Sequence, residues 1–316
     1  MTMILSALPY GLLIGVLSIG VYISYKIMNI PDLTVDGSFA VGAVTNGILC
    51  LYGHPLLGLL VGLFFGGLAG MCTGLIHTQL KVNPILSGVL VQTGLISVNV
   101  LIPLSFGEIT AKSTSFAINQ RFGGDTIFMM VQRLFGVKNP DTVKVLSIIV
   151  LVLVIAVVIA LLLLFFSTQL GLSIRATGNN EEMVKASSIN TNLNKVIAFT
   201  LANGIVGFAG ALYVQYMRSY SEGIGLGMLV TALASIIIGE TLFGNHRLFA
   251  GFIIVVLGSL IYRVIYAFAI RNGGANGIKL FSSVIVILFI AFSVIRKKVA
   301  EKRAFDKAQE EANAGN

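Results

Sequence analysis

A polar segment of 28 residues, 167–194, separates two long apolar runs and is the strongest constraint on how this chain folds. The runs on either side of it, 145–166 and 196–216, contain no charged side chain. Each is long enough to cross a hydrocarbon layer about 30 Å thick. Irregular backbone is not tolerated in lipid, because its N–H and C=O groups would lack hydrogen-bond partners. The polar segment therefore joins two membrane spans and lies in water or against a soluble protein.

This segment carries its own signal for a short helix. Asn179 and Asn180 are favourable N-cap residues, and Glu181 and Glu182 follow where the helix dipole favours negative charge. Lys185 lies in the last turn, where the dipole favours a cation. A capped helix on a loop of a membrane protein predicts a contact with another molecule.

The composition places the whole chain in a membrane. Hydrophobic residues make up 56% and charged residues 11% of the 316 positions, with a mean hydropathy of +0.93, whereas soluble domains are about a quarter charged. The 35 glycines favour close helix packing. Much of the net charge of +8 lies in a basic tail, 296–316. Such a tail indicates a cytoplasmic anchor beside anionic membrane lipid, and not a nucleic-acid site.

The apolar runs predict an all-α polytopic domain over 1–295 with nine spans, within a range of about 8–10, some of them short or broken. Two runs are short and rich in glycine or polar residues, which predicts half-crossing helices of the kind that line transport paths. The long loop 106–144 contains an amphipathic stretch, 125–137, that is expected to lie on the membrane surface or to cover a cavity. The runs are 4–25, 37–52 (short), 55–78, 85–105, 145–166, 196–217, 226–243 (short), 248–270 and 280–295.

Lysine and arginine near the span ends predict the orientation. If the polar segment and the tail are cytoplasmic, twelve such residues lie inside and eight lie outside, five of the eight on the long loop 106–144. This distribution favours a cytoplasmic C-terminus, an outside N-terminus and an extracytoplasmic long loop.

Several kinds of chemistry lack their motifs in this sequence. A phosphate loop needs a Gly-Lys pair, and the chain contains none, so it is not expected to bind ATP in that manner. His54, His77 and His246 lack the spacing of metal ligands, and no metal site is expected. Cys50 and Cys72 lie in apolar runs, where both are expected to be buried. Movement of a solute is therefore favoured over a reaction.

Ionisable groups in or beside the spans are few. Asp36 either caps the helix that follows it or faces a cavity. Glu240 either lies at the cytoplasmic mouth or pairs with His246 or Arg247. Arg263 is costly in a span unless it reaches the interface or finds a partner.

The fourth run starts at a break, because Pro84 cannot continue a helix from residues before it. Its polar side chains must face other helices or a water-filled path, since an unpaired polar group in lipid costs about 2–7 kcal/mol. Both interpretations stay open. Glycines 204, 207 and 210 of the sixth run permit close approach of another helix. The candidate path residues are Asp36, Ser38, Ser87, Gln92, Thr93, Asn99 and Glu240.

The stretch 171–212 resembles the cytoplasmic loop and the following span of bacterial ABC importer permeases of the branched-chain amino acid type. Segments 30–43 (IPDLTVDGSFAVGA) and 83–95 (NPILSGVLVQTGL) resemble other regions of that family. Ser188 departs from the pattern, since many relatives have glycine there. The matching loop positions are Gly171, Arg175, Ala176, Gly178, Asn180, Ala186, Ile189 and Asn190.

The resemblance implies a type II importer permease fold, with two permease subunits, expected as a homodimer, around a central path in the bacterial inner membrane. Two separate ATPase subunits would hold ATP and Mg²⁺ and receive the loop helix 179–187, while this chain holds no cofactor. An extracytoplasmic binding protein would deliver the substrate, for which an amino acid, aromatic or branched-chain, is the best expectation. The expected coupling residues are Gly171, Arg175, Ala176, Thr177, Gly178, Asn179, Asn180, Glu181, Glu182, Met183 and Ala186.

Two other classes of protein are alternatives to this one. An ATP-independent carrier or channel for a small polar solute is the main alternative, although a carrier is expected to pair charges inside its spans, and such pairs are nearly absent. A membrane-embedded enzyme would need a convergent nucleophile or metal set, which the scattered histidines do not supply.

Overall fold

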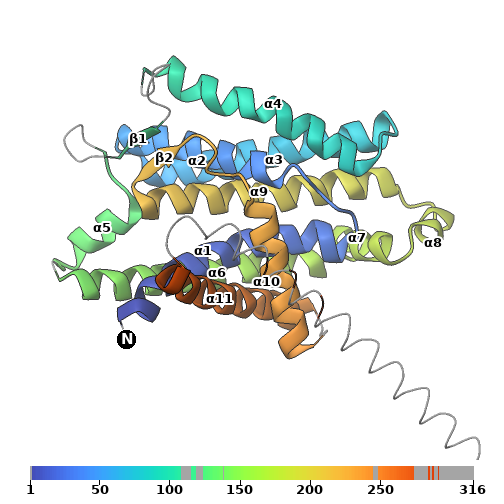
Figure 1. Ribbon diagram of the computed structural model, residues 1–316. Coiled ribbons are helices and arrows are strands. Elements are labelled where there is room, and N and C mark those ends of the chain that lie inside the picture. Colours follow the sequence, from blue (N-terminus) through green and yellow to red (C-terminus); the bar gives the residue numbers. More distant parts are fainter. Residues whose placement is uncertain are drawn as a thin grey trace, which may run out of the picture.

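The computed structural model describes residues 2–107, 115–118, 124–137, 139–244 and 248–273, together with 284, 287 and 291. These residues form a bundle of helices with one small pair of strands (Figure 1). The helices are α1 (Thr2–Tyr22), the π-helical η1 (Ile23–Ile27), α2 (Val35–Leu51), α3 (Pro55–Gln79), α4 (Pro84–Ser105), α5 (Ile127–Leu134), α6 (Pro140–Ser167), α7 (Gln169–Asn179), α8 (Glu181–Ala186), α9 (Thr191–Met217), α10 (Met228–Phe243) and α11 (Leu248–Gly273).

Proline and asparagine set the starts of two of the long helices. Pro84 and Pro140 occupy the first turn of α4 and α6, where a missing N–H costs nothing. Asn83 and Asn139 cap these helices by accepting hydrogen bonds from the backbone N–H groups of Ile85 and Asp141. The break expected at Pro84 is therefore confirmed, and a similar device starts α6.

Within the described part of the chain, six helices are long and apolar enough to cross a membrane, and two shorter apolar helices, Val35–Leu51 and Met228–Phe243, accompany them. Eight of the nine expected runs thus appear as helices, within a few residues of the expected limits. Only 284, 287 and 291 of the ninth run, 280–295, are described, and the basic tail, 296–316, falls outside the described residues.

Helix α9 lies at the centre of the bundle, packed against α2 and α3 at very short distances. A side chain at Gly207 would overlap the carbonyl group of Gly62 on α3, and one at Gly210 would overlap that of Phe39 on α2. Gly42 on α2 likewise faces the backbone of Gly207. The expected close approach along the glycines of this span is confirmed, because the absence of a Cβ lets three backbones meet.

The two short helices begin part-way along the bundle and not at its end (Figure 1). The segment 28–34 leads from η1 to the start of α2, and the segment 222–227 leads from strand β2 (Ser219–Ser221) to the start of α10. The broken character expected for these two runs is therefore confirmed. Backbone of this kind is tolerated where protein or a polar cavity surrounds it.

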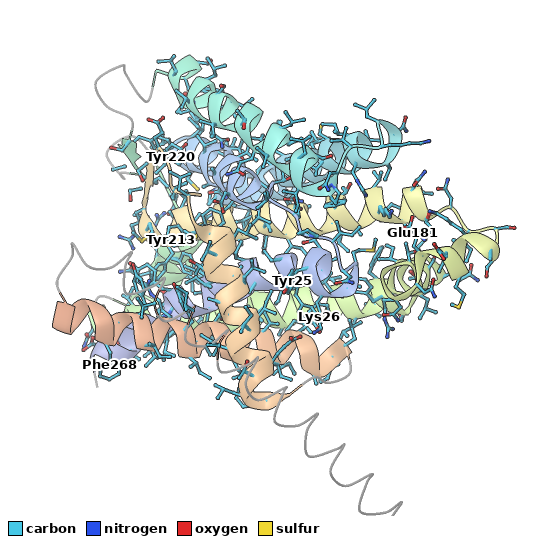
Figure 2. All side chains as sticks on the ribbon, turned by 45° about the vertical axis from the view of Figure 1, so that its right-hand side comes forward. Tyr25, Lys26, Glu181, Tyr213, Tyr220 and Phe268 are labelled. Atoms are coloured by element: carbon cyan, nitrogen blue, oxygen red, sulfur yellow. The ribbon has the colours of Figure 1, made fainter. Side chains whose placement is uncertain are left out.

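The long loop contributes two elements to one end of the bundle. Strand β1 (Ser115–Ala117) pairs antiparallel with β2, a small sheet that the sequence did not predict. Helix α5 buries Phe128 and Met129 and exposes Leu134, which confirms the amphipathic stretch. Figure 2 shows Tyr220, on β2, at this end and Glu181, on the polar segment, at the opposite end.

The two cysteines differ in exposure. Cys50 is buried, whereas Cys72 is exposed on α3, so the expectation of burial was wrong for Cys72. The exposed face of α3 is apolar at this level of the bundle, and a small sulfur side chain fits such a surface as well as a core.

Candidate functional site

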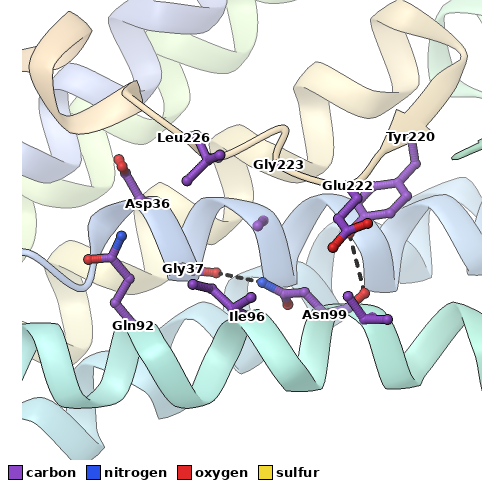
Figure 3. Close-up of a pocket in the computed structure, with 12 residues that line it drawn as sticks. Asp36, Gly37, Gln92, Ile96, Asn99, Tyr220, Glu222, Gly223 and Leu226 are labelled. Carbon is purple, nitrogen blue, oxygen red and sulfur yellow. Dashed lines mark hydrogen bonds between the residues drawn. The ribbon is translucent and has the colours of Figure 1, made fainter. Parts of the chain in front are cut away.

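A cavity of about 350 Å³ lies where the start of α10 approaches α2 and α4 (Figure 3). Three elements supply its wall: the first turns of α2, the middle of α4, and the irregular segment after β2. Residues at the start of both short runs, 37–52 and 226–243, thus line one cavity, while α10 itself supplies no lining residue. That these runs line a transport path stays a prediction. Its lining residues are Asp36, Gly37, Ala40, Gln92, Ile96, Asn99, Val100, Tyr220, Glu222, Gly223, Gly225 and Leu226.

Asp36 joins the two short helices. Its carboxylate accepts hydrogen bonds from the backbone N–H groups of Gly227, at 3.0 Å, and Leu229, at 2.8 Å. It therefore caps α10 and faces the cavity, which was one of the two expectations for it; the other, that it caps its own helix, α2, was wrong. Asp36 is the second residue of α2, two positions past the N-cap residue Thr34, so it does not occupy the capping position of its own helix. Its carboxylate instead meets free N–H groups at the start of α10.

Asn99 and Tyr220 form the opposite part of the wall (Figure 3). Asn99 donates from Nδ2 to the carbonyl oxygen of Gly37 at 3.4 Å, which links α4 to α2. The Tyr220 hydroxyl donates to the carbonyl oxygen of Asn99 at 3.3 Å. Tyr220 also stacks on Phe116, with ring centroids 5.2 Å apart, so the small β-sheet fixes its position.

The candidate path residues divide into two groups. Asp36, Gln92 and Asn99 line the cavity. Ser38, Ser87, Thr93 and Glu240 do not: Ser38 is buried, Ser87 and Thr93 donate to the carbonyl oxygens of Asn83 and Val89 in their own helix, and Glu240 lies at the far end of α10.

Sequence reasoning missed Tyr220 and Glu222, which also line the cavity. Glu222 could have been found from the sequence, because it is a carboxylate directly before a glycine-rich turn that leads into a short apolar run.

Glu240 pairs with Lys26, at the end of η1, with Nζ and Oε1 separated by 2.9 Å. The sequence expectation named His246 or Arg247 as partners, and both lie outside the described residues. Helix α10 is therefore held at both ends by polar contacts, Asp36 at its start and Lys26 at its end.

The polar segment folds into two helices and not one. Helix α7, which the sequence did not predict, precedes α8, and Asn180 caps α8 by accepting from the backbone N–H of Met183 at 3.0 Å. Glu181 Oε1 lies 2.8 Å from the Nζ atoms of both Lys185 and Lys195. Partial burial opposes ionisation of Glu181, but the hydrogen bonds and charges of the two lysines outweigh it and lower its pKa to about 2.

Helix α7 is firmly attached to the bundle. Asn194, at the start of α9, donates to the hydroxyl oxygens of Ser173, at 2.7 Å, and Thr177, at 2.9 Å. A side chain at Gly178 would overlap the carbonyl group of Ile27 in η1. The polar segment therefore contacts η1, the element that carries Lys26.

The expected coupling residues differ in exposure and form two groups. One group packs inside the loop or pairs there: Gly171, Ala176, Thr177, Gly178 and Glu181. The other is exposed on the outer surface of the loop: Arg175, Asn179, Asn180, Glu182, Met183 and Ala186.

Arg263, on α11, lies among aromatic rings. Its guanidinium carbon is 4.5 Å from the ring centroid of Tyr10 and 4.8 Å from that of Tyr266. Cation–π contacts compensate a charge in apolar surroundings. The partner that the sequence required for Arg263 is thus an aromatic pair.

Comparison with known proteins agrees with these features. The family described as "Branched-chain amino acid transport system / permease component" matches residues 3–293. This chain belongs to that family. Such permeases are components of ABC-type transport systems, with the type II importer architecture, and are transport subunits and not enzymes.

Individual relatives cover most of the permease. It is 31% identical over 300 residues to the tyrosine transport system permease protein of Clostridioides difficile, covering 92% of this chain and 91% of the relative. The ribose import permease protein RbsC of Escherichia coli is 26% identical, over 84% and 77% of the two chains. The probable branched-chain amino acid transport permease protein LivH of Methanocaldococcus jannaschii is 25% identical, over 81% and 79%. No solved structure matches the chain.

Proposed function

We propose that this permease imports an amino acid, aromatic or branched-chain, with ATP hydrolysed by a separate subunit. The proposed substrate class rests on the similarity, over nearly the whole chain, to a tyrosine transport permease. The cavity supports it, because its wall combines polar groups, at Gln92 and Asn99, with apolar side chains, at Ile96 and Val100.

The exposed surface of the polar segment is the proposed docking site for the ATPase. Met183 is 60% exposed and Ile189 is 41% exposed, so α8 and its following turn present apolar side chains to the surroundings. Val184, only 2% exposed, fixes α8 to the bundle from its inner side. A rigid helix with exposed apolar tips suits insertion into a groove of a partner protein.

A chain of contacts leads from the polar segment, at α7, to the cavity. Gly178 abuts Ile27 in η1, Lys26 of η1 pairs with Glu240 at the end of α10, and Asp36 holds the start of α10 at the cavity. We infer that motion of the loop displaces η1 and tilts α10, which changes access to the cavity. The two ATPase states must contact the loop differently for this to transmit energy.

The proposed assembly contains two ATPase subunits that hold ATP and Mg²⁺, a second copy of this permease and an extracytoplasmic binding protein. In this arrangement the polar segment, the C-terminus and the docked ATPase are cytoplasmic, while the N-terminus and the small β-sheet are outside. The separation of Glu181 and Tyr220 at opposite ends of the bundle supports this orientation (Figure 2).

The test uses the complex reconstituted in proteoliposomes with L-tyrosine as the transported probe. The double substitution Arg175→Ala with Glu182→Ala removes two exposed charged side chains of the loop. We expect it to abolish ATP-dependent uptake while the permease still inserts and purifies. The matched control, Asp141→Ala, alters an exposed carboxylate at the other end of the bundle and leaves uptake unchanged. Unchanged uptake and ATPase association in the double variant would overturn the docking proposal.

A further inference from the structure

Two polar side chains at the cavity, Asn99 and Tyr220, already use their donors within the protein. Asn99 uses its Nδ2 donor on Gly37, and Tyr220 uses its hydroxyl donor on the carbonyl oxygen of Asn99. The Oδ1 atom of Asn99 is buried without a hydrogen-bond partner in the described part of the chain, and the residue is only 5% exposed. A buried acceptor without a donor is unfavourable until a ligand supplies one.

Glu222 adds a negative charge, on an exposed side chain, to the same wall. Its side chain lies beside Tyr220 at the cavity (Figure 3) and makes no ion pair within the described ranges. No lysine, arginine or histidine occurs among the described lining residues. The other acid, Asp36, is already compensated by the backbone N–H groups of α10. The cavity therefore attracts a cation and offers no free positive group to an anion.

We propose that Glu222, together with Asn99 Oδ1, binds the ammonium group of the transported molecule. An ammonium group carries three donors and one positive charge, which matches these acceptors. The start of α10 is where a carboxylate of the solute is otherwise expected to bind, and Asp36 occupies it. This inference deepens the proposed function by making Glu222 the residue that selects an amine, and it rests on that function for the role of the cavity.

The first experiment measures the charge of the cavity on the purified permease alone. Leu226, 70% exposed at the cavity, is replaced by cysteine in a Cys72→Ser background, while Cys50 stays because it is buried. Labelling by a cationic trimethylammonium-ethyl methanethiosulfonate is expected to outpace labelling by the anionic sulfonatoethyl reagent. Glu222→Gln should lower this rate ratio by about tenfold, whereas Asp141→Asn should leave it unchanged. An unchanged ratio in Glu222→Gln overturns the proposal.

The second experiment measures amine recognition by protection of the same Leu226→Cys cysteine from a neutral reagent, methyl methanethiosulfonate. Tyramine, which has the ammonium group without the carboxylate, is expected to slow labelling, and 3-(4-hydroxyphenyl)propanoate, which has the carboxylate alone, is not. Glu222→Gln should raise the half-protecting concentration of tyramine by about tenfold, as expected for loss of one charge-assisted hydrogen bond. Glu222→Asp should retain protection. Equal protection by both compounds overturns the proposal.

These assays contain no ATPase and no binding protein, so their outcome is independent of coupling. Failure of ATP-driven L-tyrosine uptake with tyramine protection intact would overturn the proposed substrate and leave the amine site standing. Normal uptake with no tyramine protection would overturn the amine site and leave the proposed function standing.

Discussion

The carboxylate of Asp36 accepts a 2.8 Å hydrogen bond from the backbone N–H of Leu229, which lies 193 residues later in the chain. This contact joins the first turn of α2 to the first turn of α10. Asp36 itself lies at the cavity (Figure 3). A carboxylate at a helix start accepts hydrogen bonds from free N–H groups and interacts favourably with the positive end of the helix dipole. A side chain of one short helix thus caps the start of the other.

Removing this cap should loosen α10. Asp36→Ala is expected to lower the free energy of unfolding by about 1–2 kcal/mol, because two backbone N–H groups lose their acceptor. Asp36→Asn keeps one acceptor oxygen and should cost less. Thermal unfolding of the detergent-purified permease gives the magnitude, and hydrogen exchange of 227–231 locates it. Unaltered exchange there in Asp36→Ala would contradict the capping role.

The Lys26–Glu240 ion pair should couple η1 to α10. The two side chains are 34% and 26% exposed, so solvent screens the pair and a coupling energy of about 0.5–1 kcal/mol is expected. A double-mutant cycle with Lys26→Met and Glu240→Gln measures it through thermal unfolding. If the ion pair also transmits motion of the polar segment to α10, each single variant lowers ATP-dependent uptake. The charge swap Lys26→Glu with Glu240→Lys then restores part of that uptake. Strictly additive effects on stability would show that the pair is not coupled.

The polar segment should resist moderate acid. Glu181 has a pKa lowered from 4.5 to about 2, so its ion pairs contribute stability that is fully present above pH 4.5 and is lost as the pH falls through 2. Hydrogen exchange of α8, corrected for intrinsic rates, should therefore show unchanged protection at pH 5 and decreasing protection toward pH 2. Glu181→Gln should remove this acid dependence. Loss of protection already near pH 5.5 in the unaltered chain would contradict the lowered pKa.

Ser188 occupies a backbone conformation that glycine favours. Its φ is 59°, in the left-handed region, just after α8. Ser188→Gly should stabilise the folded loop by about 1 kcal/mol, whereas the β-branched Ser188→Val should destabilise it. Protease cleavage within 181–190 reports the difference, since cleavage follows local opening. Faster cleavage of the glycine variant than of the unaltered chain would refute the assignment.

The membrane architecture follows from local features of the sequence. Long uncharged runs define the spans, and the Asn-Pro pairs at 83–84 and 139–140 start α4 and α6 where the chain turns. Asn180 caps α8 as its side chain predicts. These features act within a few residues, so their effect is readable without knowing which helices are neighbours.

Features that depend on distant neighbours could not be predicted in this way. The expected cap by Asp36 was assigned to the nearest helix, but the acceptor serves a helix from the other end of the chain. Lys26 and Glu240 are separated by 214 positions. The pairing of β1 with β2 likewise joins two three-residue segments that are too short to show a strand pattern. The polar side chains predicted to line a path in the fourth run show the same limit, because only Gln92 and Asn99 among them line the cavity.

The sequence by itself determined that the chain is a helical membrane permease with an exposed, capped helix on its central loop. It did so because hydrophobic length and helix caps act locally. Only the tertiary structure decided that Asp36, Asn99 and Glu222 share one cavity and that α10 is held at both ends. Polar contacts inside a bundle depend on which helix faces meet, and that is set by the close packing of glycines on α2, α3 and α9.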